Sequence, residues 1–158
     1  MIKVLFVCLG NICRSPMADA VFAHMVKEAG LEDQIMVDSA GTGSWHVGEP
    51  AHRGTLNILQ KNSIPYNGRA RQLTRRDLSD FDYVLTMDHS NYENVMRYVG
   101  NEPQSEVRMF LSYANEAGLV DEAAVPDPYY DGRFAEVYEL VNKGSRALLD
   151  HIRQKHGI

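Results

Sequence analysis

The chain has 158 residues, of which 44% are hydrophobic and 23% charged, with a net charge of −5 and only two cysteines. Length and composition predict one globular domain over residues 1–158, and no apolar run approaches the roughly 18 residues of a membrane span or resembles a signal peptide. The negative charge without Lys/Arg blocks argues against a nucleic-acid binder, and two cysteines are too few for a secreted disulfide framework, so we expect a protein of the reducing cytoplasm.

The chain begins with an apolar run at residues 2–7, which predicts a buried strand. A helix is expected after a short loop, because Ser15 is a good N-cap and Pro16 suits the first helical position. This helix should end near Gly30, a residue type that is common at helix C-termini. Its inner face is marked by apolar residues at helical spacing, namely Ala18, Val21, Phe22, Met25 and Val26.

The remaining chain alternates between short strands and helices. Strands are expected at 35–37, 83–87 and 107–111, and helices at 50–62, 90–99 and 133–155, with a short helical turn that begins at 74–77. This alternation predicts a parallel sheet with helices on both faces. In such sheets ligands bind beyond the carboxyl ends of the strands, which is where the segment after the first strand lies.

That segment combines a thiol with a guanidinium at short spacing. Cys8 and Arg14 bracket a loop that can turn its backbone N–H groups onto one anion, and the planar guanidinium matches two phosphate oxygens. Asn11 suits the left-handed backbone that inward-facing amides require. The helix N-terminus and Arg14 favour a thiolate at Cys8 that attacks phosphorus, and the Ser15 hydroxyl can donate to this thiolate. The loop between Cys8 and Arg14 consists of Leu9, Gly10, Asn11, Ile12 and Cys13.

A leaving oxygen needs a proton, so this chemistry also requires a general acid. Asp127 is the best candidate, because Pro128 stiffens it within a turn-forming segment before the last helix. The adjacent Tyr129 and Tyr130 can wall a slot for an aromatic ring, and Trp45, the only tryptophan, can form the opposite wall. The six histidines show no metal-ligand spacing, so we expect no metal site.

Two motifs, Cys8 to Ser15 and Asp127 to Tyr130, together resemble those of the low-molecular-weight protein tyrosine phosphatases. Three intervening segments, 38–42, 69–72 and 81–88, also resemble that family, so the resemblance covers essentially the whole chain in order. It implies a flavodoxin-like three-layer α/β sandwich with a four-stranded parallel sheet and helices on both faces. It further implies hydrolysis of phosphotyrosine through a phosphocysteine intermediate, without a metal or another cofactor.

The resemblance also assigns roles to individual residues. It implies that Cys8 is the nucleophile, that Arg14 clamps the phosphoryl oxygens, and that Asp127 acts first as acid and then as base. Cys13 matches the family's second loop cysteine, which can form a disulfide with Cys8 and protect it from over-oxidation.

One position departs from the family pattern. Many eukaryotic members have a histidine that supports the loop's asparagine and serine, and Gly68 stands at that position in this chain. The hydrogen bonds around Asn11 and Ser15 must therefore differ, and we expect them to rest on Ser39 and water.

Three other functions compete with tyrosine phosphatase activity. Arsenate reductases with a similar anion loop relay a disulfide through further cysteines, and this chain has none after Cys13. Arginine phosphatases of the same fold carry a threonine where this chain has Ile12, and a branched apolar residue suits an aromatic phosphoester better. A phosphoprotein-binding module without turnover needs neither a reactive thiol nor an acid.

The family resemblance also bears on partners. It implies phosphotyrosine-containing proteins as substrates, with autophosphorylating bacterial tyrosine kinases among the candidates. The simplest expectation for the oligomeric state is a monomer, and an aromatic-rimmed site can support a weak dimer. No membrane or nucleic-acid partner is expected.

Overall fold

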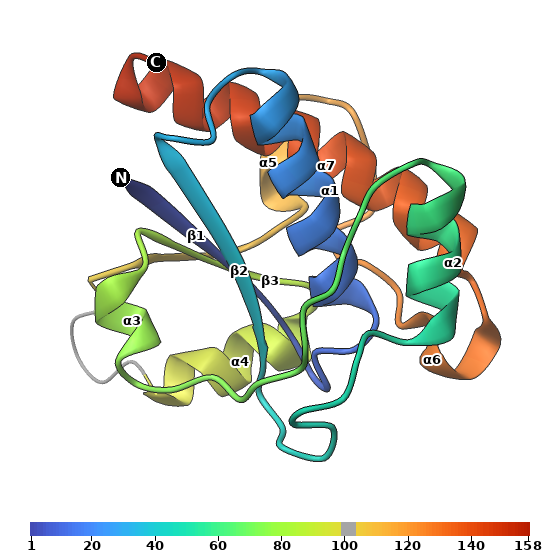
Figure 1. The fold of residues 1–158 in the computed structure, drawn as a ribbon. Helices are drawn as coiled ribbons and strands as arrows, with labels where there is room; N and C mark the ends of the chain where they lie inside the picture. The colour runs from blue at the N-terminus through green and yellow to red at the C-terminus, as the bar shows by residue number, and fades with distance from the viewer. Residues whose placement is uncertain (99–103) are drawn as a thin grey trace.

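The structure, a computed structural model, describes residues 1–98 and 104–158. Its four strands form one parallel sheet in the order β2-β1-β3-β4. This arrangement confirms the predicted flavodoxin-like α/β sandwich (Figure 1). The strands are β1 (Ile2–Cys8), β2 (Ile35–Gly41), β3 (Tyr83–Thr86) and β4 (Glu106–Met109). The helices are α1 (Arg14–Glu28), α2 (Arg53–Lys61), α3 (Asp77–Asp80), α4 (His89–Tyr98), α5 (Ser112–Glu116), α6 (Pro128–Asp131) and α7 (Phe134–His156).

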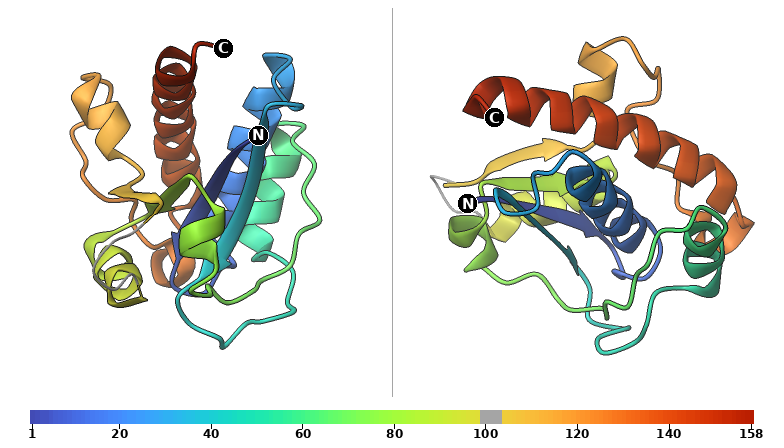
Figure 2. Two further views of the ribbon diagram at one scale, coloured as in Figure 1. Left: turned by 90° about the vertical axis from the view of Figure 1, so that its left-hand side faces the viewer. Right: turned by 45° about the horizontal axis from the view of Figure 1, so that its top comes forward.

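The central strand β1 is buried on both faces. Val4 and Phe6 join a large apolar cluster with α1 and α7, whereas Leu5 and Val7 join a smaller cluster with α3 and α4. Side chains alternate across a strand, so one apolar run supplies both clusters. The result is a sheet between two helical layers, which is visible in Figures 1 and 2.

Three predicted boundaries are wrong at residues that turn out to lie near one end of the sheet. Helix α1 begins at Arg14 with Cys13 as its N-cap, so Ser15 lies inside the helix and its hydroxyl contacts the Cys8 sulfur instead. Helix α2 begins after His52, whose Nδ1 accepts a hydrogen bond from the Gly54 N–H, whereas Pro50 pairs with the segment at residue 69. Strand β2 continues to Gly41, because the backbone pairs with β1 beyond the apolar residues.

The other elements follow the prediction more closely. The last helix, the third strand and the helical turn near residue 77 form as expected, and the strand predicted at 107–111 forms at Glu106–Met109. Helix α5 was not predicted, and the turn after Asp127 closes into the four-residue helix α6. The predicted helix at 90–99 corresponds to α4, and its last residue lies outside the described residues. Within the described residues, no helix has both the length and the apolar character needed to cross a membrane.

Candidate active site

The loop after β1 is held by hydrogen bonds to its carbonyl oxygens. The carbonyls of Cys8 and Leu9 accept from the N–H groups of Thr42 and Gly43, each at 2.9 Å, and the Ile12 carbonyl accepts from the N-cap residue of α2 at 2.7 Å. These carbonyls therefore point outward to neighbouring segments, an arrangement that lets the intervening N–H groups face the loop centre. An inward ring of backbone N–H groups is a binding site for an anion.

Asn11 stabilises the tightest part of this loop. Its φ is 58°, so the predicted left-handed conformation is confirmed. The buried amide Nδ2 donates to Ser15 Oγ at 2.8 Å and to Ser39 Oγ at 3.0 Å, while Oδ1 accepts from the Arg71 N–H at 2.9 Å. Both amide donors and one acceptor site of this side chain thus stabilise a conformation that is uncommon for residues other than glycine.

The Cys8 sulfur lies 3.0 Å from Ser15 Oγ, and both residues are buried. Because Ser15 Oγ already accepts the Asn11 amide, its own proton is available to donate to the sulfur. The competing Ala40 carbonyl is farther away, at 3.5 Å. The geometry therefore suits a hydroxyl that stabilises negative charge on Cys8, as the sequence predicted for Ser15.

Arg14 is a buried cation between two carboxylates. Its guanidinium donates to Asp88 Oδ2 at 2.6 Å and to the Val125 carbonyl at 3.0 Å, and it lies 3.6 Å from Asp127 Oδ2. Burial lowers the pKa of Arg14, but the negative charges of Cys8, Asp88 and Asp127 outweigh this effect, so the pKa is raised overall. The guanidinium stays charged at the floor of the site.

Cys13 lies in the same loop and is also buried with a free thiol. Burial raises its pKa to about 12, and the nearby charges of Cys8 and Asp127 add to this effect. Cys13 is therefore protonated at neutral pH.

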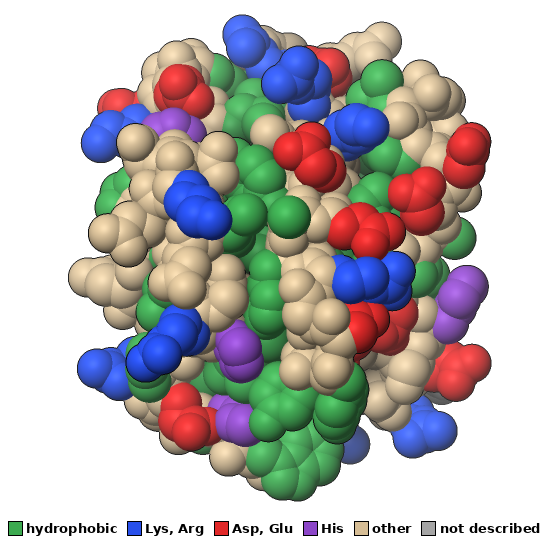
Figure 3. All heavy atoms as spheres, turned by 90° about the vertical axis from the view of Figure 1, so that its right-hand side faces the viewer, with side chains coloured by type: hydrophobic (Ala, Val, Ile, Leu, Met, Phe, Trp, Pro, Cys, Tyr) green, Lys and Arg blue, Asp and Glu red, His purple; other side chains and the backbone are tan. Residues whose placement is uncertain are grey.

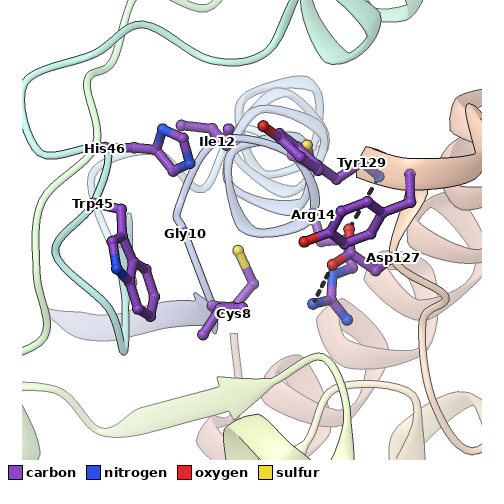
Figure 4. A pocket seen from close by; sticks show the side chains of 11 residues that line it. Cys8, Gly10, Ile12, Arg14, Trp45, His46, Asp127 and Tyr129 are labelled. Carbon is purple, nitrogen blue, oxygen red and sulfur yellow. Dashed lines mark hydrogen bonds and ion pairs between the residues drawn. The ribbon is translucent and has the colours of Figure 1, made fainter.

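Cys8, Cys13, Arg14 and Asp127 belong to the lining of a cavity of about 270 Å³. Figure 4 shows the Cys8 sulfur pointing into it, with Trp45 on one side and Arg14 and Asp127 on the other. Asp127 caps α6, where its Oδ1 accepts from the Tyr129 N–H at 3.1 Å. The structure thus brings together all the site residues predicted from the sequence except Asn11 and Ser15, which support the loop from behind. The lining consists of Cys8, Leu9, Gly10, Ile12, Cys13, Arg14, Trp45, His46, Asp127, Tyr129 and Tyr130.

The rim of the cavity is aromatic and exposed. Trp45 is 72% exposed and Tyr130 is 87% exposed, whereas Tyr129 packs edge-on against Tyr130 at 5.0 Å between ring centroids. Figure 3 shows hydrophobic side chains gathered at the lower end of one face with histidines beside them, at the end where Figure 1 places the loop after β1. Large apolar groups exposed at a cavity mouth are suited to contact an aromatic ligand.

Two glycines, Gly41 at the end of β2 and Gly43 just after it, allow this close arrangement. A Cβ on Gly41 would lie 2.8 Å from the Leu9 carbonyl oxygen, and a Cβ on Gly43 would lie 1.9 Å from the Trp45 ring. The indole therefore rests directly on the backbone at Gly43, and any larger residue there would displace it.

Comparisons with known proteins agree with this geometry. A protein-family model described as low molecular weight phosphotyrosine protein phosphatase matches residues 3–157. The chain belongs to this family. It is 46% identical to the low molecular weight protein-tyrosine-phosphatase YfkJ of Bacillus subtilis, over 98% of each chain, and 45% identical to PtpA of Staphylococcus epidermidis, over 96% of this chain and 94% of PtpA.

Solved structures give the same result for this low molecular weight phosphatase. The crystal structure of YfkJ matches with a TM-score of 0.93 and covers 98% of this chain and 96% of its own. The crystal structure of DARP, a Drosophila arginine phosphatase, matches with 31% identity and a TM-score of 0.88 and covers 96% of this chain and 98% of its own. The fold is therefore shared with a phosphatase named for a different phosphoamino acid.

Two residues of this site, His46 in the cavity lining and Asp88 behind Arg14, were not among the predicted site residues. Asp88 binds Arg14 through Oδ2 and accepts the Asn91 N–H at the start of α4 through Oδ1, at 2.8 Å. A signal for it was present, because a carboxylate directly after a parallel strand lies at the ligand-binding edge of the sheet.

The space beside Gly68 is filled by Tyr66 in this phosphatase. A Cβ on Gly68 would lie 2.4 Å from the Tyr66 hydroxyl, which donates to Asp19 Oδ2 at 3.5 Å. Burial raises the pKa of Asp19 to about 7, a neighbouring carboxylate adds to this effect, and hydrogen bonds from Ser39 and Tyr66 oppose it. The expected support of Asn11 by Ser39 is confirmed, and it continues to a carboxyl group and a phenol.

This network predicts a pH dependence of stability. The pKa of Asp19 is raised from 3.8 to about 7, so the folded chain holds a proton there that the unfolded chain loses. The stabilising contribution is complete at low pH and is lost as the pH rises from about 4 to about 7. In Asp19→Asn this loss should disappear, which changes the slope of the unfolding free energy by up to about 1.4 kcal/mol per pH unit.

Urea unfolding of the wild type and Asp19→Asn between pH 4 and 8 measures this slope. The matched control is Asp33→Asn, because Asp33 is exposed in the turn before β2. Identical slopes for the wild type and Asp19→Asn would contradict the prediction.

Proposed function

We propose that this protein hydrolyses phosphotyrosine in phosphoproteins by way of a phosphocysteine at Cys8. The observation that carries the proposal is the placement of the Cys8 sulfur, the Arg14 guanidinium and the Asp127 carboxyl around one aromatic-walled cavity of about 270 Å³. A thiolate, an oxyanion clamp and a proton donor are the groups that phosphoryl transfer to sulfur requires.

In the first step the Cys8 thiolate attacks phosphorus while the bond from phosphorus to the tyrosine oxygen breaks. The loop N–H groups and Arg14 hold the equatorial oxygens, whose charge must be stabilised in the transition state. Asp127 gives its proton to the leaving phenolate. Its side chain is 36% exposed, so it can exchange protons with solvent between turnovers.

In the second step Asp127, now ionised, takes a proton from a water molecule that attacks the phosphocysteine. Inorganic phosphate forms and the Cys8 thiolate leaves. The Ser15 hydroxyl, 3.0 Å from the sulfur, stabilises that leaving thiolate. Cys8 thus acts first as nucleophile and then as leaving group, and Asp127 acts first as acid and then as base.

Asp127→Ala tests the role of the acid. We expect kcat for phosphotyrosine to fall by about 10²- to 10⁴-fold, because the strongly basic phenolate must leave without a proton. Turnover of 4-nitrophenyl phosphate, whose leaving group is far less basic, should fall much less. Steady-state kinetics on both substrates gives the ratio.

Two controls frame that measurement. Asp131→Ala removes a carboxylate of the same turn that pairs with Arg133 at 2.9 Å and should leave the ratio unchanged. Cys8→Ser should abolish turnover of both substrates and retain phosphate binding. Full activity in Cys8→Ser would overturn the proposed function.

Ile12 favours tyrosine over arginine as the phosphorylated residue. It lines the cavity near the aromatic walls, where an apolar side chain contacts a phenyl ring better than a guanidine. Arsenate reduction is disfavoured, because its disulfide relay needs a further cysteine and this chain has only Cys8 and Cys13.

The preference is measured by comparing kcat/KM for phosphotyrosine and phosphoarginine. We expect the wild type to prefer phosphotyrosine, and Ile12→Thr to reduce this preference by about tenfold, because a polar group replaces apolar contact with the ring. Ile12→Val keeps an apolar side chain and should retain most of the preference. A wild type that turns over phosphoarginine faster would reverse the assignment.

We also propose that Cys13 protects Cys8 from irreversible oxidation. Peroxide oxidises the Cys8 thiolate to a sulfenic acid, the Cys13 sulfur attacks it, water leaves and a disulfide forms. The charge of the Cys8 thiolate is one reason why the pKa of Cys13 is raised, and its loss on oxidation helps Cys13 to ionise.

Peroxide treatment followed by a dithiol reductant tests this role. The wild type should recover most of its activity, whereas Cys13→Ala should recover little, each measured relative to its own untreated sample. Mass spectrometry of the oxidised wild type should find the disulfide. Equal recovery of the two proteins would rule out protection by Cys13.

A further inference from the structure

A second hollow lies next to the active-site cavity. It has a volume of about 360 Å³, and Leu9 and Trp45 form a wall common to both cavities. Its other residues come from three separate segments, namely the chain just after β2, the chain before α3 and the helix α4. They are Thr42, Gly43, Arg75, Asn94, Arg97 and Tyr98.

The hollow is positively charged in a protein of net charge −5. Among the described residues, its lining holds two guanidinium groups, Arg75 and Arg97, and no carboxylate. Within residues 1–98 and 104–158, Arg97 donates to the neutral amide of Asn94 at 3.2 Å, and neither arginine forms an ion pair. By contrast, Arg76 next in sequence pairs with Asp80 at 3.3 Å. No carboxylate of the described residues neutralises either group, and both can bind an anionic ligand.

The position of the hollow relates it to the substrate. A phosphotyrosine seated against Trp45 in the first cavity leaves its peptide at the rim, beside the second. An extended peptide rises about 3.3 Å per residue, so a side chain two or three positions away lies about 7 to 10 Å along the chain. Leu9 and Trp45 line both cavities, so the second cavity adjoins the rim along which such a side chain lies.

We propose that the hollow between Trp45 and α4 binds an Asp or Glu side chain of the substrate, within three positions of the phosphotyrosine. The carboxylate contacts Arg75 and Arg97, whose planar guanidinium groups suit it. The hollow thus selects phosphotyrosines in acidic surroundings. This inference rests on the proposed function in one respect, namely that the phosphotyrosine binds in the first cavity.

The test uses two phosphotyrosine peptides. One carries glutamates on both sides of the phosphotyrosine, and the other carries glutamines at the same positions. We expect kcat/KM of the wild type to be about fivefold higher for the acidic peptide, mainly through KM, which is the size expected of exposed ion pairs. The preference should weaken at high salt, because salt screens exposed charges.

The double variant Arg75→Gln/Arg97→Gln should lose this preference, with the ratio of the two peptides close to one. Its melting temperature shows whether the fold is intact. Arg76→Gln is the matched control, because it removes the same charge from the adjacent position and should retain the preference.

Three outcomes would overturn the inference: equal kcat/KM for the two peptides in the wild type, a preference that survives in the double variant, or a preference lost equally in Arg76→Gln. A wild type without turnover of 4-nitrophenyl phosphate would instead overturn the proposed function. In that case fluorescence anisotropy measures how tightly each of the two peptides binds to the Cys8→Ser variant. The comparison still decides whether the hollow selects acidic residues.

Discussion

The rest of the site depends on the conformation of one short loop that must present N–H groups inward to an anion. Such a loop is unfavourable by itself, because its residues lack the hydrogen bonds of a regular element and Asn11 must adopt a positive φ. Neighbouring segments stabilise it by binding its carbonyls, and Ser39 and the Arg71 backbone bind the Asn11 amide. The anion site is therefore built before any ligand arrives, which is the preorganisation that electrostatic catalysis needs.

A second constraint is the burial of charge. Arg14 is almost completely buried, and a buried cation is tolerated only when carboxylates and carbonyls surround it. Asp88 and the Val125 carbonyl hold it directly, so it keeps one position on the phosphate side of Cys8. Asp127 stands farther away, at 3.6 Å, and it remains partly exposed. In the proposed mechanism, the firmly bound Asp88 fixes the Arg14 clamp and the more distant Asp127 exchanges the proton.

The sequence predicted those features whose cause is local. The apolar run of β1 and the periodic face of α1 report directly on burial, and the spacing of Cys8 and Arg14 reports on the loop between them. The predicted helix starts were wrong where tertiary contacts outweigh the local preference of a residue. Ser15 has a side chain typical of an N-cap, but it lies inside the helix, where its hydroxyl contacts the Cys8 sulfur. Pro50 suits a helix start, but its segment pairs with residue 69.

Most strands and helices, and the candidate loop and acid, could be predicted from the amino-acid sequence, because each depends on residues that are close together in the chain. Contacts between distant groups became visible only once the strands and helices were packed together. Asp88 reaches Arg14 across 74 positions, and Tyr66 fills the space beside Gly68 to contact Asp19. Such contacts follow from how the strands and helices pack, and spacing along the chain carries no record of them.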